Sequence, residues 1–183
     1  MEVKNSARLS FKLMGSDDTQ DLFELDQDPA VMKYINGGEP TSMEKIESVF
    51  IPRLESYTNK EKGWGMWGVY ITDTSEFLGW ILVRPMEFFS EHPEYDNLEL
   101  GWRFKQAAWG KGYGTEAANA VKNALIFSNN SSQKIDRLSA VAMLGNEGSI
   151  GIMKKIGMSY VKTYMHEDPL GDIEAVYYTQ HIN

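Results

Sequence analysis

Three glycines stand at alternate positions in the stretch "WGKGYGTEA", directly before a run of helix-forming residues. Gly110, Gly112 and Gly114 each cost backbone entropy, which a chain spends where it needs unusual dihedral angles or a close approach of another group. The first turn of a helix presents unpaired N–H groups and a partial positive charge. The spacing therefore predicts a loop that binds an anion, most often phosphate, although a flexible connection into a helix also uses glycine.

Two common phosphate-binding motifs do not fit this loop. A P-loop needs the pattern Gly-x-x-x-x-Gly-Lys-Ser/Thr, which is absent from the stretch. A dinucleotide fingerprint needs glycine at the position of Thr115. The preceding strand also alternates polar and apolar residues, unlike the buried parallel strand of that fold. A nucleotide-dependent oxidoreductase is therefore disfavoured.

A second candidate motif lies further along the chain, in "NEGSIGIMKKIGM". Asn146 and Ser149 are three residues apart, which is the spacing of a helix N-cap and the residue whose N–H it accepts. Gly157 then stands where a helix of this length would end. From the residues alone, a helix cap and a ligand-binding role remain equally open.

Three stretches, "LELGWRF", "WGKGYGTEAANAV" and "NEGSIGIMKKIGM", together resemble the GNAT acetyltransferase superfamily, in particular the RimJ/RimL-like branch of ribosomal-protein alanine N-acetyltransferases. The resemblance is strongest over residues 97–160. It implies a mixed α/β (α+β) fold, in which a largely antiparallel central sheet of about seven strands carries helices on both faces. It also implies acetyl-CoA as cosubstrate.

The resemblance assigns the acetyl-CoA site residue by residue. Backbone N–H groups of the glycine loop would hold the pyrophosphate of coenzyme A, Asn146 would lie beside the pantetheine arm, and the N–H of Leu100 would polarise the thioester carbonyl. The family motif, Arg/Gln-x-x-Gly-x-Gly/Ala, has Trp109 where Arg or Gln is usual. The predicted loop residues are Trp109, Gly110, Lys111, Gly112, Tyr113, Gly114 and Thr115.

Acetyl transfer to an amine needs a base, because amines are mostly protonated at neutral pH, and it benefits from a proton donor to the departing thiolate. Glu99 is the candidate base, although a glutamate on a half-exposed strand is often only a surface residue. Ser149 is the candidate acid. Many members of the family carry a tyrosine acid where Met153 stands here, and methionine has no proton to donate.

The acceptor is expected to be a primary amine, with a protein N-terminus favoured and a small amine as the alternative. Its walls are predicted at residues 34–41 and 166–172, where acidic side chains would suit a cation. The chain has no cysteine and its three histidines show no ligand spacing, so we expect no covalent intermediate and no metal. A non-catalytic acyl-CoA-binding module of the same fold remains the alternative.

The predicted elements follow the order β-αα-βββ-α-β-α-ββ within one domain, residues 1–183. The first strand is "RLSFKL", a helix begins near Ser42 with a kink or break at Pro52, and another runs from Tyr113 to Phe127. The aromatic group of Trp64, Trp67, Trp80 and Trp102 is assigned mainly to the core, with one or two members at the acceptor pocket.

A net charge of −8 argues against a nucleic-acid partner, since phosphate contacts need a basic face. No apolar run reaches the ~20 residues of a membrane span, and the first residues lack a signal peptide's apolar stretch. We therefore expect a cytoplasmic monomer or homodimer that does not act at a membrane.

Overall fold

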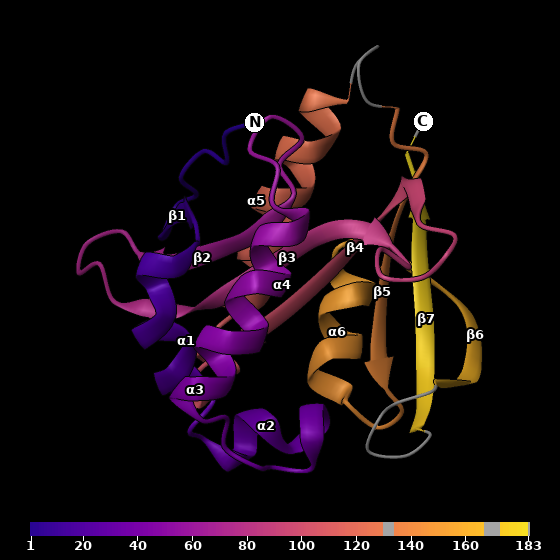
Figure 1. The fold of residues 1–183 in the computed structure, drawn as a ribbon. Coiled ribbons are helices and arrows are strands. Elements are labelled where there is room, and N and C mark those ends of the chain that lie inside the picture. The colour runs from indigo at the N-terminus through magenta and orange to yellow at the C-terminus, as the bar shows by residue number, and fades with distance from the viewer. Residues whose placement is uncertain (130–133, 167–172, 183) are drawn as a thin grey trace.

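The computed structural model describes residues 1–129, 134–166 and 173–182. A seven-stranded sheet runs through these residues in the order β1-β2-β3-β4-β5-β7-β6 (Figure 1). Neighbouring strands are antiparallel, except for β4 and β5, which are parallel. The strands are β1 (Leu9–Leu13), β2 (Gly65–Ile71), β3 (Phe77–Met86), β4 (Glu94–Phe104), β5 (Arg137–Met143), β6 (Ser159–His166) and β7 (Ile173–His181).

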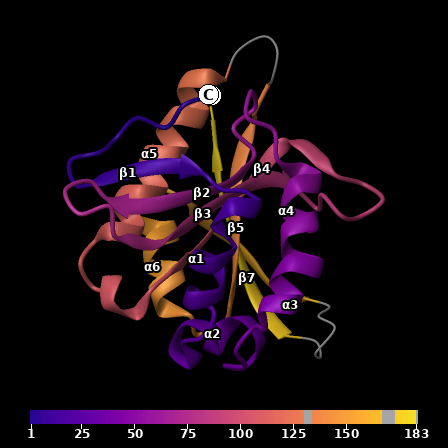
Figure 2. The same cartoon turned by 60° about the vertical axis from the view of Figure 1, so that its left-hand side comes forward.

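Helices cover both faces of the sheet (Figure 2). The helices are α1 (Thr19–Leu25), α2 (Pro29–Asn36), α3 (Met43–Lys45), α4 (Ile51–Tyr57), α5 (Tyr113–Ser128) and α6 (Glu147–Lys155). Buried side chains of α5 and α6 share one hydrophobic cluster with the sheet, and those of α1, α2 and α4 share a second. The predicted fold class is confirmed. The first helical region is broken before Pro29 into α1 and α2, as its sequence indicates.

The helical region after residue 41 shows how the chain accommodates Pro52. Ser42 accepts a hydrogen bond from the N–H of Lys45 at 3.2 Å, so the predicted start is correct. A π-helical turn, η2 (Ile46–Phe50), then leads directly into α4. Pro52 therefore lies in the first turn of α4, where its missing N–H costs little. The chain therefore changes from a π-helical to an α-helical turn just before Pro52, where a kink or break was predicted.

Strand β4 alternates as its sequence indicates. Leu98 and Leu100 are buried in the cluster beneath α5, while Glu99 is directed to the opposite face. Gly157 follows α6 with a φ of +91°, as a C′ glycine does. Among the helices that the structure describes, none is long and apolar enough to cross a membrane.

Candidate active site

The glycine loop connects β4 to α5. A short 3-10 turn, η3 (Gln106–Ala108), is followed by Gly110 and Gly112, whose φ angles are +72° and +80°. These left-handed dihedrals strain any residue with a Cβ, so both glycines are required by the backbone. Gly112 is also the N-cap of α5 and supplies no side-chain cap. The first amides of α5 therefore have no side-chain acceptor at their N-terminal end, as an anion site requires.

Gly114 is required by packing rather than by its backbone conformation. Its φ is not positive, but a Cβ at this position would lie 2.8 Å from Cδ1 of Ile152 on α6. The third glycine thus lets α5 and α6 pack closely. Of the seven predicted loop residues, Lys111 and Tyr113 do not line the adjacent cleft; the other five are Trp109, Gly110, Gly112, Gly114 and Thr115.

Arg8, which sequence reasoning missed, braces the loop from the N-terminal segment. Its guanidinium donates to the carboxylate of Glu116 at 2.7 Å and to the carbonyl of Lys111 at 3.1 Å, and it lies over the ring of Tyr113. Burial opposes ionisation of Glu116, but hydrogen bonds from Ser6 and Arg8 outweigh this and lower its pKa. Glu116 therefore stays ionised in the first turn of α5, with Arg8 as its counter-ion.

Strands β4 and β5 separate beside the loop. Their parallel pairing covers Asn97 to Glu99 and ends where Glu99 faces Ser139. The N–H of Lys105 bonds to β3, so residues of even number turn their backbone groups towards β5. Leu100 lies at the end of the paired stretch, and Trp102 is the next residue whose N–H faces the gap. Beyond the pairing, both strands line one cleft.

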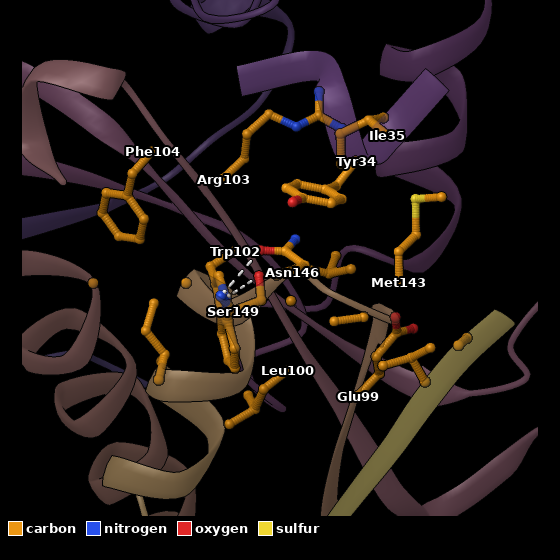
Figure 3. A pocket seen from close by; sticks show the side chains of 18 of the residues that line it. Tyr34, Ile35, Glu99, Leu100, Trp102, Arg103, Phe104, Met143, Asn146 and Ser149 are labelled. Atoms are coloured by element: carbon orange, nitrogen blue, oxygen red, sulfur yellow. Dashed lines mark hydrogen bonds between the residues drawn. The ribbon is translucent and has the colours of Figure 1, made fainter. Parts of the chain in front are cut away.

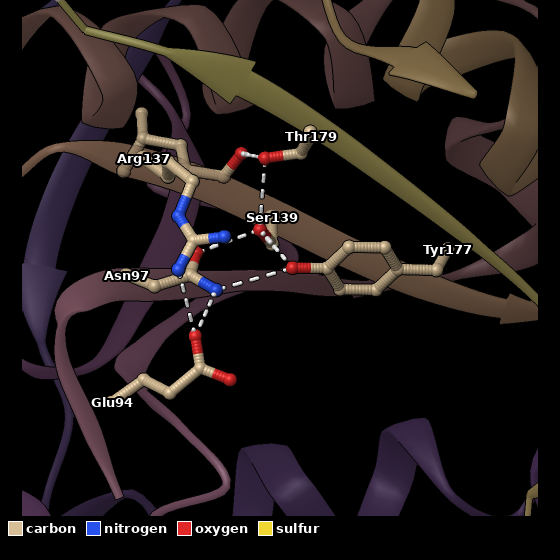
Figure 4. A network of polar contacts seen from close by, with 7 residues as sticks. Glu94, Asn97, Arg137, Ser139, Tyr177 and Thr179 are labelled. Atoms are coloured by element: carbon tan, nitrogen blue, oxygen red, sulfur yellow. Dashed lines mark hydrogen bonds and ion pairs between the residues drawn. The ribbon is translucent and has the colours of Figure 1, made fainter. Parts of the chain in front are cut away.

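A buried polar network fixes the point where the strands separate (Figure 4). The hydroxyl of Ser139 on β5 donates to Oδ1 of Asn97 on β4 at 2.7 Å and lies 2.7 Å from the hydroxyl of Tyr177 on β7. Asn97 also donates to Tyr177 and to Glu94. Asn97 and Ser139 are fully buried, and their polar atoms all have partners. The network therefore joins β4, β5 and β7 at the point where the pairing of β4 and β5 ends.

Glu99, the predicted base, lies in the cleft and is paired. Its Oε2 accepts from Nε of Arg84, the residue opposite it on β3, at 2.6 Å. The Arg84 guanidinium in turn lies over the rings of Tyr57 and Phe89. Within the described residues, no hydrogen bond to Oε1 occurs. Glu99 is thus oriented by Arg84 and still has an oxygen able to accept a proton.

Asn146 and Ser149 lie at the N-terminus of α6, across the cleft from Glu99 (Figure 3). Oδ1 of Asn146 accepts the N–H of Ser149 at 3.2 Å, so Asn146 is the N-cap that its spacing indicates. The hydroxyl oxygen of Ser149 accepts the indole N–H of Trp102 at 3.1 Å. Met153, on the next turn of α6, is completely buried. Ser149 rather than Met153 therefore presents a polar group to the cleft.

The cleft encloses about 1250 Å³, more than the roughly 300–1,000 Å³ that holds one drug-sized ligand. One half is formed by the glycine loop and α6. The other half is aromatic, with Tyr34, Trp80, Phe88, Phe89 and Tyr164 in its lining. Burial raises the pKa of the Tyr164 phenol, and the nearby carboxylates act in the same direction. The cleft therefore combines the glycine loop and the N-terminus of α6 on one side with an aromatic half on the other. Its volume leaves room for two substrates.

The predicted acceptor walls are found in part. Tyr34 and Ile35 line the cleft, and Tyr34 reaches across it to donate to the carbonyl of Gly145 at 3.2 Å. Glu39 does not line it, and Glu167, Asp168 and Asp172 lie outside the described residues. The cleft lining also holds cationic side chains that the sequence did not single out, namely Arg53, Arg84 and Arg103, and it includes Lys155.

Arg103 is the second paired arginine of the aromatic half. Its guanidinium forms an ion pair at 2.5 Å with the buried carboxylate of Asp26, the C-cap residue of α1. It also lies over the ring of Trp80. Asp26 also accepts a hydrogen bond from the hydroxyl of Thr41.

Among the described residues, no group of three or more His, Asp or Glu side chains is arranged to hold a metal ion.

Comparison with known proteins places this arrangement in a family. The family model described as "Acetyltransferase (GNAT) domain" matches residues 8–159, most of the chain. The chain belongs to the GNAT acetyltransferase family. This assignment makes the protein an acetyltransferase.

Relatives of this GNAT protein support the assignment. "Uncharacterized N-acetyltransferase YnaD" of Bacillus subtilis (strain 168) is 31% identical, over 77% of this chain and 73% of that protein. "FsC-acetyl coenzyme A-N(2)-transacetylase" of Aspergillus fumigatus is 25% identical, over 89% and 67%. The solved structure of RimL, a "Ribosomal L7/L12 alpha-N-protein acetyltransferase in complex with Coenzyme A", superposes with a TM-score of 0.75 over 98% and 97% of the two chains. At 12% identity it shares the fold alone.

Proposed function

We propose that the protein transfers the acetyl group of acetyl-CoA to a primary amine, with both substrates bound in the one cleft. The observation that carries the proposal is the joint lining of that cleft by the uncapped N-terminus of α5, the gap between β4 and β5, and Glu99. Amides from Gly110 to Thr115 would hold the pyrophosphate, and the gap would take the pantetheine arm beside Asn146. Two positive-φ glycines and the missing cap fit that ligand.

Glu99 is the proposed base. An amine with a pKa between about 8 and 10.4 arrives protonated and must lose a proton before it can attack. Glu99 takes this proton directly or through a water, while the contact with Arg84 orients the carboxylate. The nitrogen then attacks the thioester carbonyl without a covalent intermediate on the protein, which has no cysteine.

Backbone amides and Ser149 would complete the reaction. The N–H groups of Leu100 and Trp102, at and beyond the end of the β4–β5 pairing, are the proposed donors to the developing oxyanion. Ser149 would protonate the departing sulfur. Its position in the first turn of α6 brings it to the cleft together with Asn146.

A protein N-terminus is the favoured acceptor, as in the RimL-like branch, and a small amine is the alternative. An open cleft suits a chain end, and its aromatic half suits an apolar residue next to the amine. The fold alone does not choose between these acceptors, because it also carries enzymes for polyamines and antibiotics: structural neighbours include a spermidine and an aminoglycoside acetyltransferase. A cytoplasmic monomer or homodimer is part of the proposal.

Thiol release from acetyl-CoA tests this function. The purified protein is supplied with acetyl-CoA and with peptides of differing N-termini, spermidine or an aminoglycoside, and free thiol and acetylated product are both measured. The proposal predicts release that depends on one acceptor class, peptides first. Tight coenzyme A binding with no release for any acceptor would instead identify a non-catalytic acyl-CoA-binding module.

A further inference from the structure

The indole of Trp102 is the only side chain that the described structure shows bonded to the hydroxyl of Ser149. The two residues lie on β4 and α6, 47 positions apart, and meet at 3.1 Å (Figure 3). The Trp102 ring packs against the main hydrophobic cluster, which holds the indole in place. The bond therefore holds the Ser149 hydroxyl in place from β4.

The direction of this bond determines what Ser149 can do. An indole N–H only donates, so the Ser149 oxygen must accept, and the single hydroxyl proton is left for another partner. Oδ1 of Asn146 accepts the backbone N–H of Ser149, and no hydrogen bond joins it to the Ser149 hydroxyl. No described residue accepts it, although Ser149 is partly exposed to the cleft. The arrangement leaves Ser149 as a hydrogen-bond donor to a ligand in the cleft.

We propose that Trp102 is a positioning residue, whose indole N–H holds Ser149 in the orientation that donates its proton to the leaving sulfur. This inference rests on the proposed function, in which Ser149 is the acid. As the carbon–sulfur bond breaks, the sulfur keeps the electron pair and takes the Ser149 proton, which solvent replaces. The amine nitrogen loses two protons, one before it attacks and one from the tetrahedral adduct, and each passes to Glu99 and then to solvent. The indole N–H stabilises the Ser149 oxygen while its proton is transferred.

A double-mutant cycle tests the coupling. Trp102→Phe keeps the ring and removes only the N–H, and Ser149→Ala removes the hydroxyl. We expect Ser149→Ala to lower kcat by roughly 10²-fold and Trp102→Phe by about 10-fold, each with an unchanged KM for acetyl-CoA. The double variant should be no slower than Ser149→Ala alone, because the indole acts only through the hydroxyl. Thermal unfolding of each variant checks that the fold is kept.

Trp80→Phe is the matched control, since it makes the same substitution at another tryptophan of the cleft. Its effect on kcat should multiply with that of Ser149→Ala. Full kcat in Trp102→Phe, or effects of Trp102→Phe and Ser149→Ala that multiply, would overturn the positioning role and leave the proposed function standing. Full kcat in Ser149→Ala would overturn the proposed acid, and the role of Trp102 with it.

Discussion

Glu99 carries most of the proposed chemistry at the scale of single residues, and its partner decides how it can act. The pair with Arg84 keeps the carboxylate turned into the cleft, with Oε1 left to accept a proton. A surface glutamate without this partner would sample many rotamers, and its oxygen would seldom face an amine. The pairing is therefore the feature that separates a base from an exposed strand residue.

Glu99→Gln should lower kcat at neutral pH by roughly 10²-fold or more, because the amide cannot take the amine's proton. Acetyl-CoA affinity should stay unchanged, since Glu99 lies in the other half of the cleft. The deficit should shrink as the pH approaches the pKa of the acceptor amine, where the amine is neutral without help. Steady-state rates over a pH series measure this.

Glu76→Gln is the control, because Glu76 is an exposed carboxylate in the β2–β3 turn, away from the cleft. It should leave kcat unchanged over the same pH range. Wild-type turnover by Glu99→Gln at neutral pH would remove Glu99 from the mechanism.

Elements meet at the glycine loop in a way that only the folded chain reveals. The motif itself is contiguous, so its position, its helix and the dihedral role of Gly112 follow from a short stretch of sequence. Arg8 precedes the loop by about a hundred residues, and no local pattern connects the two. For the same reason, the packing of Gly114 against α6 was not visible in the sequence.

Arg8→Met should weaken acetyl-CoA binding about five-fold, because it leaves Glu116 as an uncompensated negative charge beside the proposed phosphate site. Arg8→Met combined with Glu116→Gln should recover most of the affinity. Lys12→Met breaks another ion pair, between exposed Lys12 and buried Asp18, and should leave the affinity unchanged. Titration of each variant with acetyl-CoA gives the dissociation constants. A double variant as weak as Arg8→Met alone would contradict the charge argument.

Across the whole molecule, periodicity predicted the sheet, the order of its elements and the faces of β4, because these depend on residues close together in sequence. The contacts that give the cleft its chemistry depend on register and packing instead. The pair of Glu99 with Arg84 follows from the β3–β4 register, and Trp102 reaches Ser149 only when α6 packs beside β4. The buried network around Ser139 likewise joins three strands.

Calorimetric titration of the purified chain with acetyl-CoA tests the central claim most directly, because every later step depends on the backbone amides at the start of α5. We expect saturable binding of one acetyl-CoA per chain, with a dissociation constant in the roughly 1 μM–1 mM range of enzyme substrates. Coenzyme A should compete for the same site. A titration in which neither compound binds would contradict the account, whichever amine was offered.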